Sequence, residues 1–151
     1  MDIYNELGLI YSEALMEVIS KVTGVRLKVV SQDDDDGFED ITGVMSLNGK
    51  KSGMLFVTAS TADIRVLCSY FVGVTLSEVT ESDVEDAICE FANMTAGNAK
   101  MSLSGTDYMF TLAQPFTVKG ADMSIISKNR TRVISRTLSD GNVTVKIKVV
   151  Y

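Results

Sequence analysis

The chain is 151 residues long, which favours one folded domain, and its 46% hydrophobic content can form a sizeable core without metal or disulfide crosslinks. Its 14 basic and 20 acidic residues give a net charge of −6, which disfavours nucleic acid and anionic membranes as partners. The absence of histidine excludes Ser-His-Asp catalysis, Cys-His catalysis and histidine zinc sites. Because we find neither a membrane-spanning apolar run nor a secretory signal, we expect a cytoplasmic protein.

Two further functional classes lose support from missing motifs. Neither a G-x-G-x-x-G nor a G-x-x-x-x-G-K-[ST] pattern occurs, so the common nucleotide-binding loops are not expected. Cys68 and Cys89 stand in separate predicted helices without a C-x-x-C pair. We expect two reduced, buried thiols, and a disulfide or a thiolate nucleophile stays open as the alternative.

The first part of the sequence predicts a helix, a strand and a loop, in that order. Apolar residues recur at helical spacing over 3–22, and Gly24 is a natural C-cap. The alternating, β-branched segment 25–30 predicts a strand. The acidic run Asp33 to Asp36 predicts a solvated loop, since its surroundings do not match a calcium-binding EF-hand loop.

A β-hairpin and a second helix follow. The apolar segments 41–47 and 53–59 flank Asn48-Gly49, which is a strong hairpin signal. Thr61 is expected to cap the next helix, and Gly73 is expected to end it.

The second half predicts the longest helix and then a series of strands. Ser82 and Glu85 match a capping box at the start of a helix over 83–102. Pro115 suits a strand edge or a bulge, and Asp140-Gly141-Asn142 predicts a second hairpin turn. The β-rich segments are 108–112, 116–118, 123–126, 133–138 and 143–150.

Part of the first predicted helix matches part of the long one. Residues 13–24 align without gaps on residues 86–97, and a predicted hairpin follows each copy. Chance similarity between two amphipathic helices is the alternative. We expect one domain over residues 1–151, built from two related halves of about 1–73 and 74–151. The predicted fold is a pseudo-symmetric α+β domain, with two long helices packed on one face of a mainly antiparallel sheet.

The second copy carries a polar stripe. At about 100° per residue, Asp86, Glu90, Asn93 and Gly97 fall on one side of the helix, opposite its apolar face. The Asn93 amide both donates and accepts hydrogen bonds, so it can hold a water molecule in a fixed direction. The Glu90 carboxylate suits a Lys or Arg of a partner. Together they suit phosphoryl transfer in which a partner brings phosphate and metal, although a solvated helix face has the same pattern.

At these residues the sequence resembles the CheC/CheX family of chemotaxis phosphatases. The family motif runs Asp/Ser-x-x-x-Glu-x-x-Asn-x-x-x-Gly on a helix, and here it reads Asp86, Glu90, Asn93 and Gly97. The extension from Asn93 to Lys100 is similar to the CheX branch. The order of the predicted elements resembles the family over most of the chain.

The resemblance implies a phosphatase that acts on a phosphorylated CheY-type receiver domain. It implies that Asn93 orients the attacking water and that Glu90 pairs with the receiver's active-site lysine. Asp86 and Gly97 are expected to bind the partner or to support the site. Mg²⁺ is expected on the receiver, so this chain is expected to need no cofactor and to hold no metal of its own.

The resemblance also bears on the number of sites and on assembly. The first helix has Glu17 but carries Ser20 where the motif requires asparagine, so we expect one active site, on the second helix. A homodimer formed through sheet edges is implied as well.

Two other functions stay open. One is a non-catalytic, dimeric interaction module that docks on a signalling partner without hydrolysis. The other is a structural component of a switch complex, related by fold to flagellar motor proteins.

Two residue groups outside the motif each allow two interpretations. Met94, Met101 and Met109 are expected to fill the core, with adaptation to a partner as the alternative. A basic group is expected to form an exposed strand-and-loop surface, with docking of an acidic partner as the alternative. Its members are Lys128, Arg130, Arg132 and Arg136.

Overall fold

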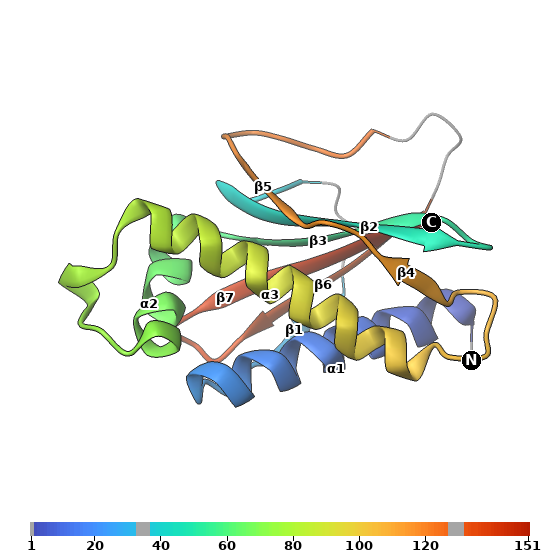
Figure 1. Cartoon of the computed structure of the whole chain (residues 1–151), viewed down its shortest axis with the longest axis horizontal. Helices are drawn as coiled ribbons and strands as arrows, with labels where there is room; N and C mark the ends of the chain where they lie inside the picture. The colour runs from blue at the N-terminus through green and yellow to red at the C-terminus, as the bar shows by residue number, and fades with distance from the viewer. Residues whose placement is uncertain (1, 33–36, 127–131) are drawn as a thin grey trace.

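Two long helices lie side by side across one face of an antiparallel sheet in the computed structural model (Figure 1). The structure describes residues 2–32, 37–126 and 132–151, so the predicted acidic loop at 33–36 lies outside the described residues. The long helices are α1 (Ile3–Thr23) and α3 (Glu81–Ser102), and the shorter α2 (Thr61–Val72) lies at one end of the sheet. The predicted α+β class is confirmed, with both long helices on the same face.

Local residues explain where α1 begins and where α1 and α2 end. The Asp2 carboxylate accepts a hydrogen bond from the backbone N–H of Tyr4 at the start of α1. Gly24 ends α1 with φ of 79°, and Gly73 ends α2 with φ of 73°, the left-handed conformation that glycine adopts without strain.

Two predicted helix starts are wrong by one or two residues. Ser60, not Thr61, caps α2, because the Ser60 hydroxyl accepts from the N–H of Asp63 while the Thr61 hydroxyl donates to Asp40. The capping box of α3 consists of Thr80 and Asp83 rather than Ser82 and Glu85. A short 3₁₀ helix, η1 (Leu76–Glu78), precedes Thr80 and sets where α3 can begin.

Most of the predicted strands are present. The first begins at residue 28 rather than 25, and segment 123–126 forms no strand but only an isolated bridge from Ser124 to Gly37. Pro115 falls between two short strands, as expected for a residue that cannot donate to a sheet. The strands are β1 (Lys28–Ser31), β2 (Ile41–Gly49), β3 (Gly53–Ala59), β4 (Phe110–Leu112), β5 (Phe116–Lys119), β6 (Val133–Ser139) and β7 (Thr144–Val150).

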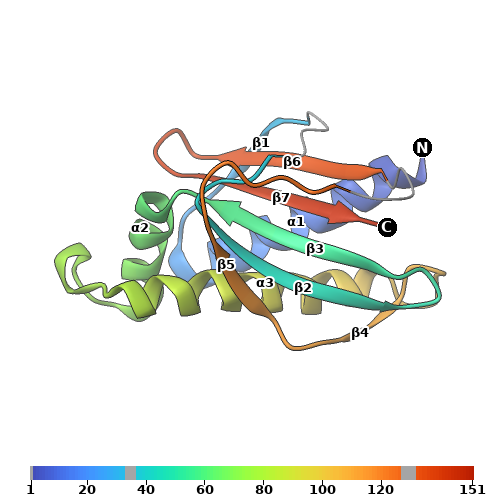
Figure 2. The same ribbon diagram turned by 90° about the horizontal axis from the view of Figure 1, so that it is seen from above.

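The strands form one sheet in the order β1-β6-β7-β3-β2-β4, and β5 also pairs with β2 (Figure 2). The hairpins β2-β3 and β6-β7 meet at the central pair of β3 and β7. Beyond them, β1 of the first half pairs with β6, and β5 of the second half pairs with β2. The two halves therefore exchange their outer strands, although their common origin stays a prediction.

The core lies between the helices and the sheet, and one glycine brings α3 especially close. A Cβ atom on Gly43 of β2 would lie 2.4 Å from the carbonyl oxygen of Ile88 and 3.1 Å from the Cβ of Ala92. Backbone therefore rests on backbone at this point. The core residues with no exposed surface include Leu7, Tyr11, Leu15, Leu55, Val57, Ile88 and Phe91.

The predicted exposed basic surface is wrong at Arg136, whose side chain is buried against α1 with an exposed fraction of 7%. Arg132 is exposed, pairs with Asp2 at 3.2 Å and lies 4.8 Å above the Tyr4 ring. Lys128 and Arg130 lie outside the described residues.

Candidate functional site

The candidate site lies on the outer face of α3. The opposite face of the helix is buried and holds α3 in place. Buried residues recur at helical spacing along the side that packs on the sheet and the neighbouring helices. The helix starts at a well-formed capping box, in which Asp83 accepts from the Thr80 N–H and the Thr80 hydroxyl accepts from the Asp83 N–H. The buried residues are Val84, Ala87, Ile88, Phe91, Ala92, Thr95, Ala96 and Ala99.

The structure brings the four predicted motif residues together in one stripe. Asp86 is exposed, whereas Glu90, Asn93 and Gly97 are partly buried. They follow one another at intervals of one helical turn on the face turned away from the sheet. Their assignment to catalysis or partner binding stays a prediction at this stage.

The two polar side chains at the centre of the stripe are available to a partner. Within the ranges that the structure describes, neither the Glu90 carboxylate nor the Asn93 amide makes a hydrogen bond or an ion pair. A partly buried amide without a protein partner keeps two donors and one acceptor oxygen for an incoming molecule.

Two hollows adjoin the stripe, one along each half of α3. One, of about 270 Å³, lies between α2 and the first half of α3, and its lining includes Glu90. The other, of about 440 Å³, lies between α1 and the second half of α3, and its lining includes Gly97. A Cβ atom on Gly97 would meet no atom within 4 Å, so the stripe is open at this point. The remaining lining residues are Phe71, Val72, Asp83, Asp86 and Ala87 for the first hollow, and Glu17, Val18, Lys21, Met94, Asn98 and Met101 for the second.

The α1 residues beside the stripe were not expected to belong to the site. The Asn98 amide donates a 3.1 Å hydrogen bond to the Glu17 carboxylate, which ties α3 to α1 next to Gly97. This contact joins residues 81 positions apart, so no local sequence pattern predicts it. On α2, Val72 lines the same hollow as Glu90 and is 46% exposed, although its apolar character alone predicts a core position.

The methionine prediction is wrong for two of the three residues. Met101 is 78% exposed and Met109 is 47% exposed, so neither fills the core. Met101 follows Gly97 by one turn, so a helical projection extended past the motif would have placed it near the stripe. A flexible, exposed methionine such as Met101 beside the stripe suits contact with another protein.

The equivalent positions on α1 do not form a comparable stripe. Ser20 stands where asparagine is needed, and Glu17 is bound to Asn98. Gly24, the counterpart of Gly97, already ends its helix, whereas α3 continues beyond Gly97 to Ser102.

Acidic groups dominate the N-terminal end of α3. Lys119 pairs with Glu81 and, at 3.6 Å, with Glu85. The hydrogen bond and charge of Lys119 lower the pKa of Glu81. The Thr80 N–H and hydroxyl lower the pKa of Asp83. This end of the stripe therefore stays negatively charged at neutral pH, which suits a cationic group of a partner.

The cysteines offer no activated nucleophile. Both thiols are free, and Cys68 is buried whereas Cys89 is only partly buried. Burial raises the pKa of each thiol, which disfavours the reactive thiolate. The Cys68 thiol donates a 3.4 Å hydrogen bond to the Asp83 carbonyl, so its role is in packing below the site.

The described part of the chain contains neither a candidate metal site nor a candidate membrane span. Among those residues, no three or more Cys, Asp or Glu side chains are grouped so that they could hold a metal ion. The described helices also include none with the length and apolar character needed to cross a membrane.

Comparisons with known proteins connect this arrangement to one family. The model of the family described as "Chemotaxis phosphatase CheX" matches residues 41–138, whereas a comparison with curated proteins gave no match. The fold is similar to that of chemotaxis protein CheX from Desulfovibrio desulfuricans, with 20% identity, a TM-score of 0.82, and coverage of 97% of this chain and 99% of that one.

Two further solved structures share the fold. A CheC-like superfamily protein from Shewanella sp. PV-4 has 24% identity and a TM-score of 0.83, with 99% of this chain and 98% of that chain covered. A chain of the CheX-CheY-BeF₃-Mg²⁺ complex from Borrelia burgdorferi has 14% identity and a TM-score of 0.78, with coverage of 93% and 94%.

Proposed function

The chain belongs to the CheX family of chemotaxis phosphatases, and from this premise we propose that it dephosphorylates a phosphorylated CheY-type response regulator. The observation that carries the proposal is the open stripe on α3, where the Glu90 carboxylate and the Asn93 amide have no partner among the described residues. A receiver domain as partner is supported by the shared fold with a chain of a CheX-CheY complex.

Asn93 acts by positioning water. Its amide oxygen accepts a hydrogen bond from the water and its NH₂ group donates to an oxygen of the water or of the phosphoryl group. The water oxygen then bonds to phosphorus, and the bond from phosphorus to the receiver's aspartyl oxygen breaks. The bonding electron pair stays on the aspartate, and a water proton goes to the released phosphate. No covalent intermediate with this chain is needed.

Glu90 fixes the orientation of the receiver. A carboxylate only accepts hydrogen bonds, so it pairs with the lysine of the receiver's active site while Asn93, one turn further along the helix, reaches the phosphoryl group. Asp86 adds negative charge beside Glu90, and Gly97 leaves space for the receiver's backbone to approach. Mg²⁺ is assigned to the receiver, so this chain contributes alignment rather than a cofactor.

The test is the decay of a phosphorylated CheY-type receiver with Mg²⁺, with and without this protein. We expect faster decay with the native chain and loss of the acceleration in Asn93→Ala, by about 100-fold or more, because one positioned hydrogen-bonding group is removed. Glu90→Ala is expected to weaken receiver binding as well as turnover. Ser20→Ala, at the corresponding place on α1, is the matched control and should retain full activity.

The outcomes separate the enzyme from a docking module. Binding of the receiver without any acceleration by the native chain would favour the non-catalytic module. Acceleration that survives Asn93→Ala would reject the role of Asn93 while leaving the phosphatase intact.

We also propose a homodimer formed through exposed sheet edges. The edge strand β1 exposes Val30 by 61%, and at the other edge Leu112 and Phe116 are 48% and 49% exposed. Light scattering should give twice the chain mass of 16.4 kDa. A monomer at all concentrations used for activity would contradict this arrangement.

A further inference from the structure

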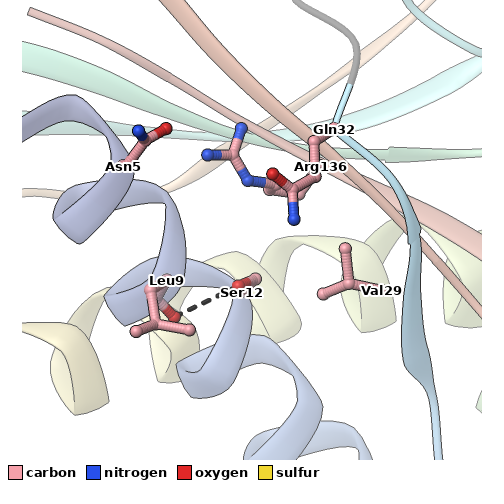
Figure 3. A pocket seen from close by; sticks show the side chains of 6 residues that line it. All are labelled: Asn5, Leu9, Ser12, Val29, Gln32 and Arg136. Atoms are coloured by element: carbon pink, nitrogen blue, oxygen red, sulfur yellow. Dashed lines mark hydrogen bonds between the residues drawn. The ribbon is translucent and has the colours of Figure 1, made fainter. Parts of the chain in front are cut away.

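A third hollow, away from the α3 stripe, contains the buried side chain of Arg136. It has a volume of about 310 Å³ and lies where α1 faces β1, with β6 behind (Figure 3). Among the described residues that line it, none is acidic, and one is the arginine of β6. The lining residues are Asn5, Leu9, Ser12, Val29, Gln32 and Arg136.

The charge of Arg136 is uncompensated in the described structure. Its side chain is 93% buried, and Nη1 donates a 2.8 Å hydrogen bond to the carbonyl oxygen of Ser135. Within residues 2–32, 37–126 and 132–151, no carboxylate pairs with the guanidinium. A guanidinium removed from water without an anionic partner is costly, because the carbonyl dipole replaces only part of its hydration.

The guanidinium's place is fixed by the packing of α1 over it. A Cβ atom on Gly8 would lie 2.4 Å from Nη2 and 2.7 Å from Cζ of Arg136. With Arg136 in this conformation, the absence of a side chain at Gly8 lets α1 lie directly on the guanidinium. Figure 3 shows the guanidinium extending from β6 toward α1, in the hollow that it shares with the amides of Asn5 and Gln32.

The lining defines the chemistry of a ligand. Arg136, Asn5 and Gln32 supply N–H donors, whereas the Ser12 hydroxyl already donates to the Leu9 carbonyl and can only accept. Leu9 and Val29 supply apolar surface. One buried positive charge matches one negative charge, and the planar fork of a guanidinium matches the two oxygens of a carboxylate.

We propose that this hollow binds a small organic carboxylate through Arg136, with the amides of Asn5 and Gln32 as additional donors and a short aliphatic group against Leu9 and Val29. The volume is at the small end of the range for ligand pockets, which suits a metabolite-sized monoanion. The site shares no lining residue with the two hollows beside the α3 stripe. The inference therefore stands independently of the phosphatase.

The experiment is a titration of the ¹⁵N-labelled chain with sodium acetate at constant ionic strength, followed by two-dimensional NMR. We expect saturable shifts of the Gly8 amide and the Asn5 and Gln32 side-chain amides, with a dissociation constant on the order of millimolar. Acetamide, the uncharged analogue, should leave these signals unshifted, and inorganic phosphate should bind more weakly than acetate. Equal effects of acetamide, or tighter binding of phosphate, would overturn the proposed ligand class.

Variants locate the site. Arg136→Gln should abolish the acetate shifts, whereas Arg26→Gln, which removes one exposed positive charge elsewhere, should retain them. If Arg136→Gln does not fold, the double variant Asn5→Ala with Gln32→Ala tests the site instead. Both residues are exposed, so the double variant should fold. The loss of the two amides should weaken acetate binding at least about threefold. Unchanged binding in that double variant, or loss of binding in Arg26→Gln, would reject the site.

One further variant tests for an internal competitor. Four aspartates, Asp33 to Asp36, follow Gln32 in the sequence, so the titration is repeated with all four replaced by Asn. We expect acetate to bind both the native chain and this variant. Saturable shifts in the variant alone would mean that the native chain supplies its own carboxylate, which would overturn the proposal.

Discussion

Asn93 differs from several other polar residues on the described helices, because its side chain has no hydrogen-bond partner there. Asn98 is bound to Glu17, and Ser12 and Ser69 donate to carbonyl oxygens of their own helices. Asn93 has no such partner in the described structure, although it is partly buried on a helix held firmly by its opposite face. The packed helix therefore fixes the backbone of Asn93, while its amide remains available to a partner.

The first prediction concerns the two-ended character of this amide. Asn93→Asp keeps the shape of the side chain but replaces the NH₂ donor with a charged acceptor. We expect dephosphorylation of the receiver to fall by about 100-fold or more, since the negative charge would face the phosphoryl group. Single-turnover decay of the phosphorylated receiver at saturating protein measures this effect. Retained activity would show that the donor of Asn93 is not used.

The second prediction concerns Gly97, which has free space where a Cβ would be added. Gly97→Ala should raise the free energy of unfolding by about 0.5–1 kcal/mol, because alanine is a better helix former. Gly97→Leu should instead raise KM for the phosphorylated receiver, with little change in kcat, because the larger side chain obstructs docking. Urea unfolding and steady-state kinetics measure the two effects. An unchanged KM in Gly97→Leu would place the receiver elsewhere.

At the scale of elements, α3 is the part of the fold on which the proposed site depends. Its start is set by Thr80 and Asp83 after the short helix η1, and its middle rests on β2 at Gly43. Both features hold α3 close to the stripe, so changes in them bear directly on the position of Glu90 and Asn93.

The third prediction tests the observed capping box against the one expected from sequence. Thr80→Ala should lower the free energy of unfolding by about 1 kcal/mol, because the Asp83 N–H loses its hydrogen-bond acceptor. Ser82→Ala, two residues further on, should change it by less than about 0.5 kcal/mol. Urea unfolding of both variants decides. A larger loss in Ser82→Ala would restore the sequence-based assignment.

The fourth prediction concerns the incomplete copy on α1. Ser20→Asn in an Asn93→Ala background should not restore turnover, although it recreates a Glu-x-x-Asn pair on α1. The reason is that Glu17 is bound to Asn98 and that α1 ends at Gly24. Decay of the phosphorylated receiver is the measurement. Recovered activity would show that α1 carries a latent second site.

These elements also show what the sequence could and could not predict. The β2-β3 hairpin, the end of α1 at Gly24 and the motif stripe follow from local spacing and were predicted. The predicted turn residues Asn48 and Gly49 instead end β2, where they pair with β4. The sequence offers two overlapping capping boxes for α3, Thr80 with Asp83 and Ser82 with Glu85. Which one forms depends on where η1 ends, and no local sequence pattern predicts that position.

Tertiary contacts limited the prediction elsewhere. Arg136 was expected to be exposed because it is charged, and its burial depends on the absence of a side chain at Gly8, 128 positions earlier. Segment 123–126 has β-forming composition, but only Ser124 finds a bridge partner. Contacts between distant residues therefore set the limits of what local pattern could show.

At the scale of the whole molecule, a pair of tyrosines links the two ends of the chain. The hydroxyl groups of Tyr11 on α1 and Tyr151 after β7 lie 2.9 Å apart. Tyr151 also stacks edge to face on Tyr108, with ring centroids 5.0 Å apart. Burial is the main cause that raises the pKa of both Tyr11 and Tyr151 above the usual value for tyrosine.

The fifth prediction follows from this pair. Because the folded state disfavours ionised Tyr11 and Tyr151, stability is fully present below about pH 10, the ordinary pKa of tyrosine, and falls as the pH rises above it. Tyr11→Phe should lower the free energy of unfolding at pH 7 by about 1 kcal/mol and flatten its fall at alkaline pH. Urea unfolding at neutral and alkaline pH measures both, with the exposed Tyr70→Phe as control. An equally steep alkaline fall in Tyr11→Phe would contradict this origin.

The contact between Gly43 and the Ile88 carbonyl limits how this site can be transplanted or redesigned. Side chains between a helix and a sheet can repack and so let the helix shift, but two main chains in contact have no rotamers to exchange. Ile88 lies between Asp86 and Glu90, so this contact limits how far the stripe can approach or leave the sheet. A designed protein that carries the same stripe over a strand with any larger residue beneath it would display the right side chains at the wrong height.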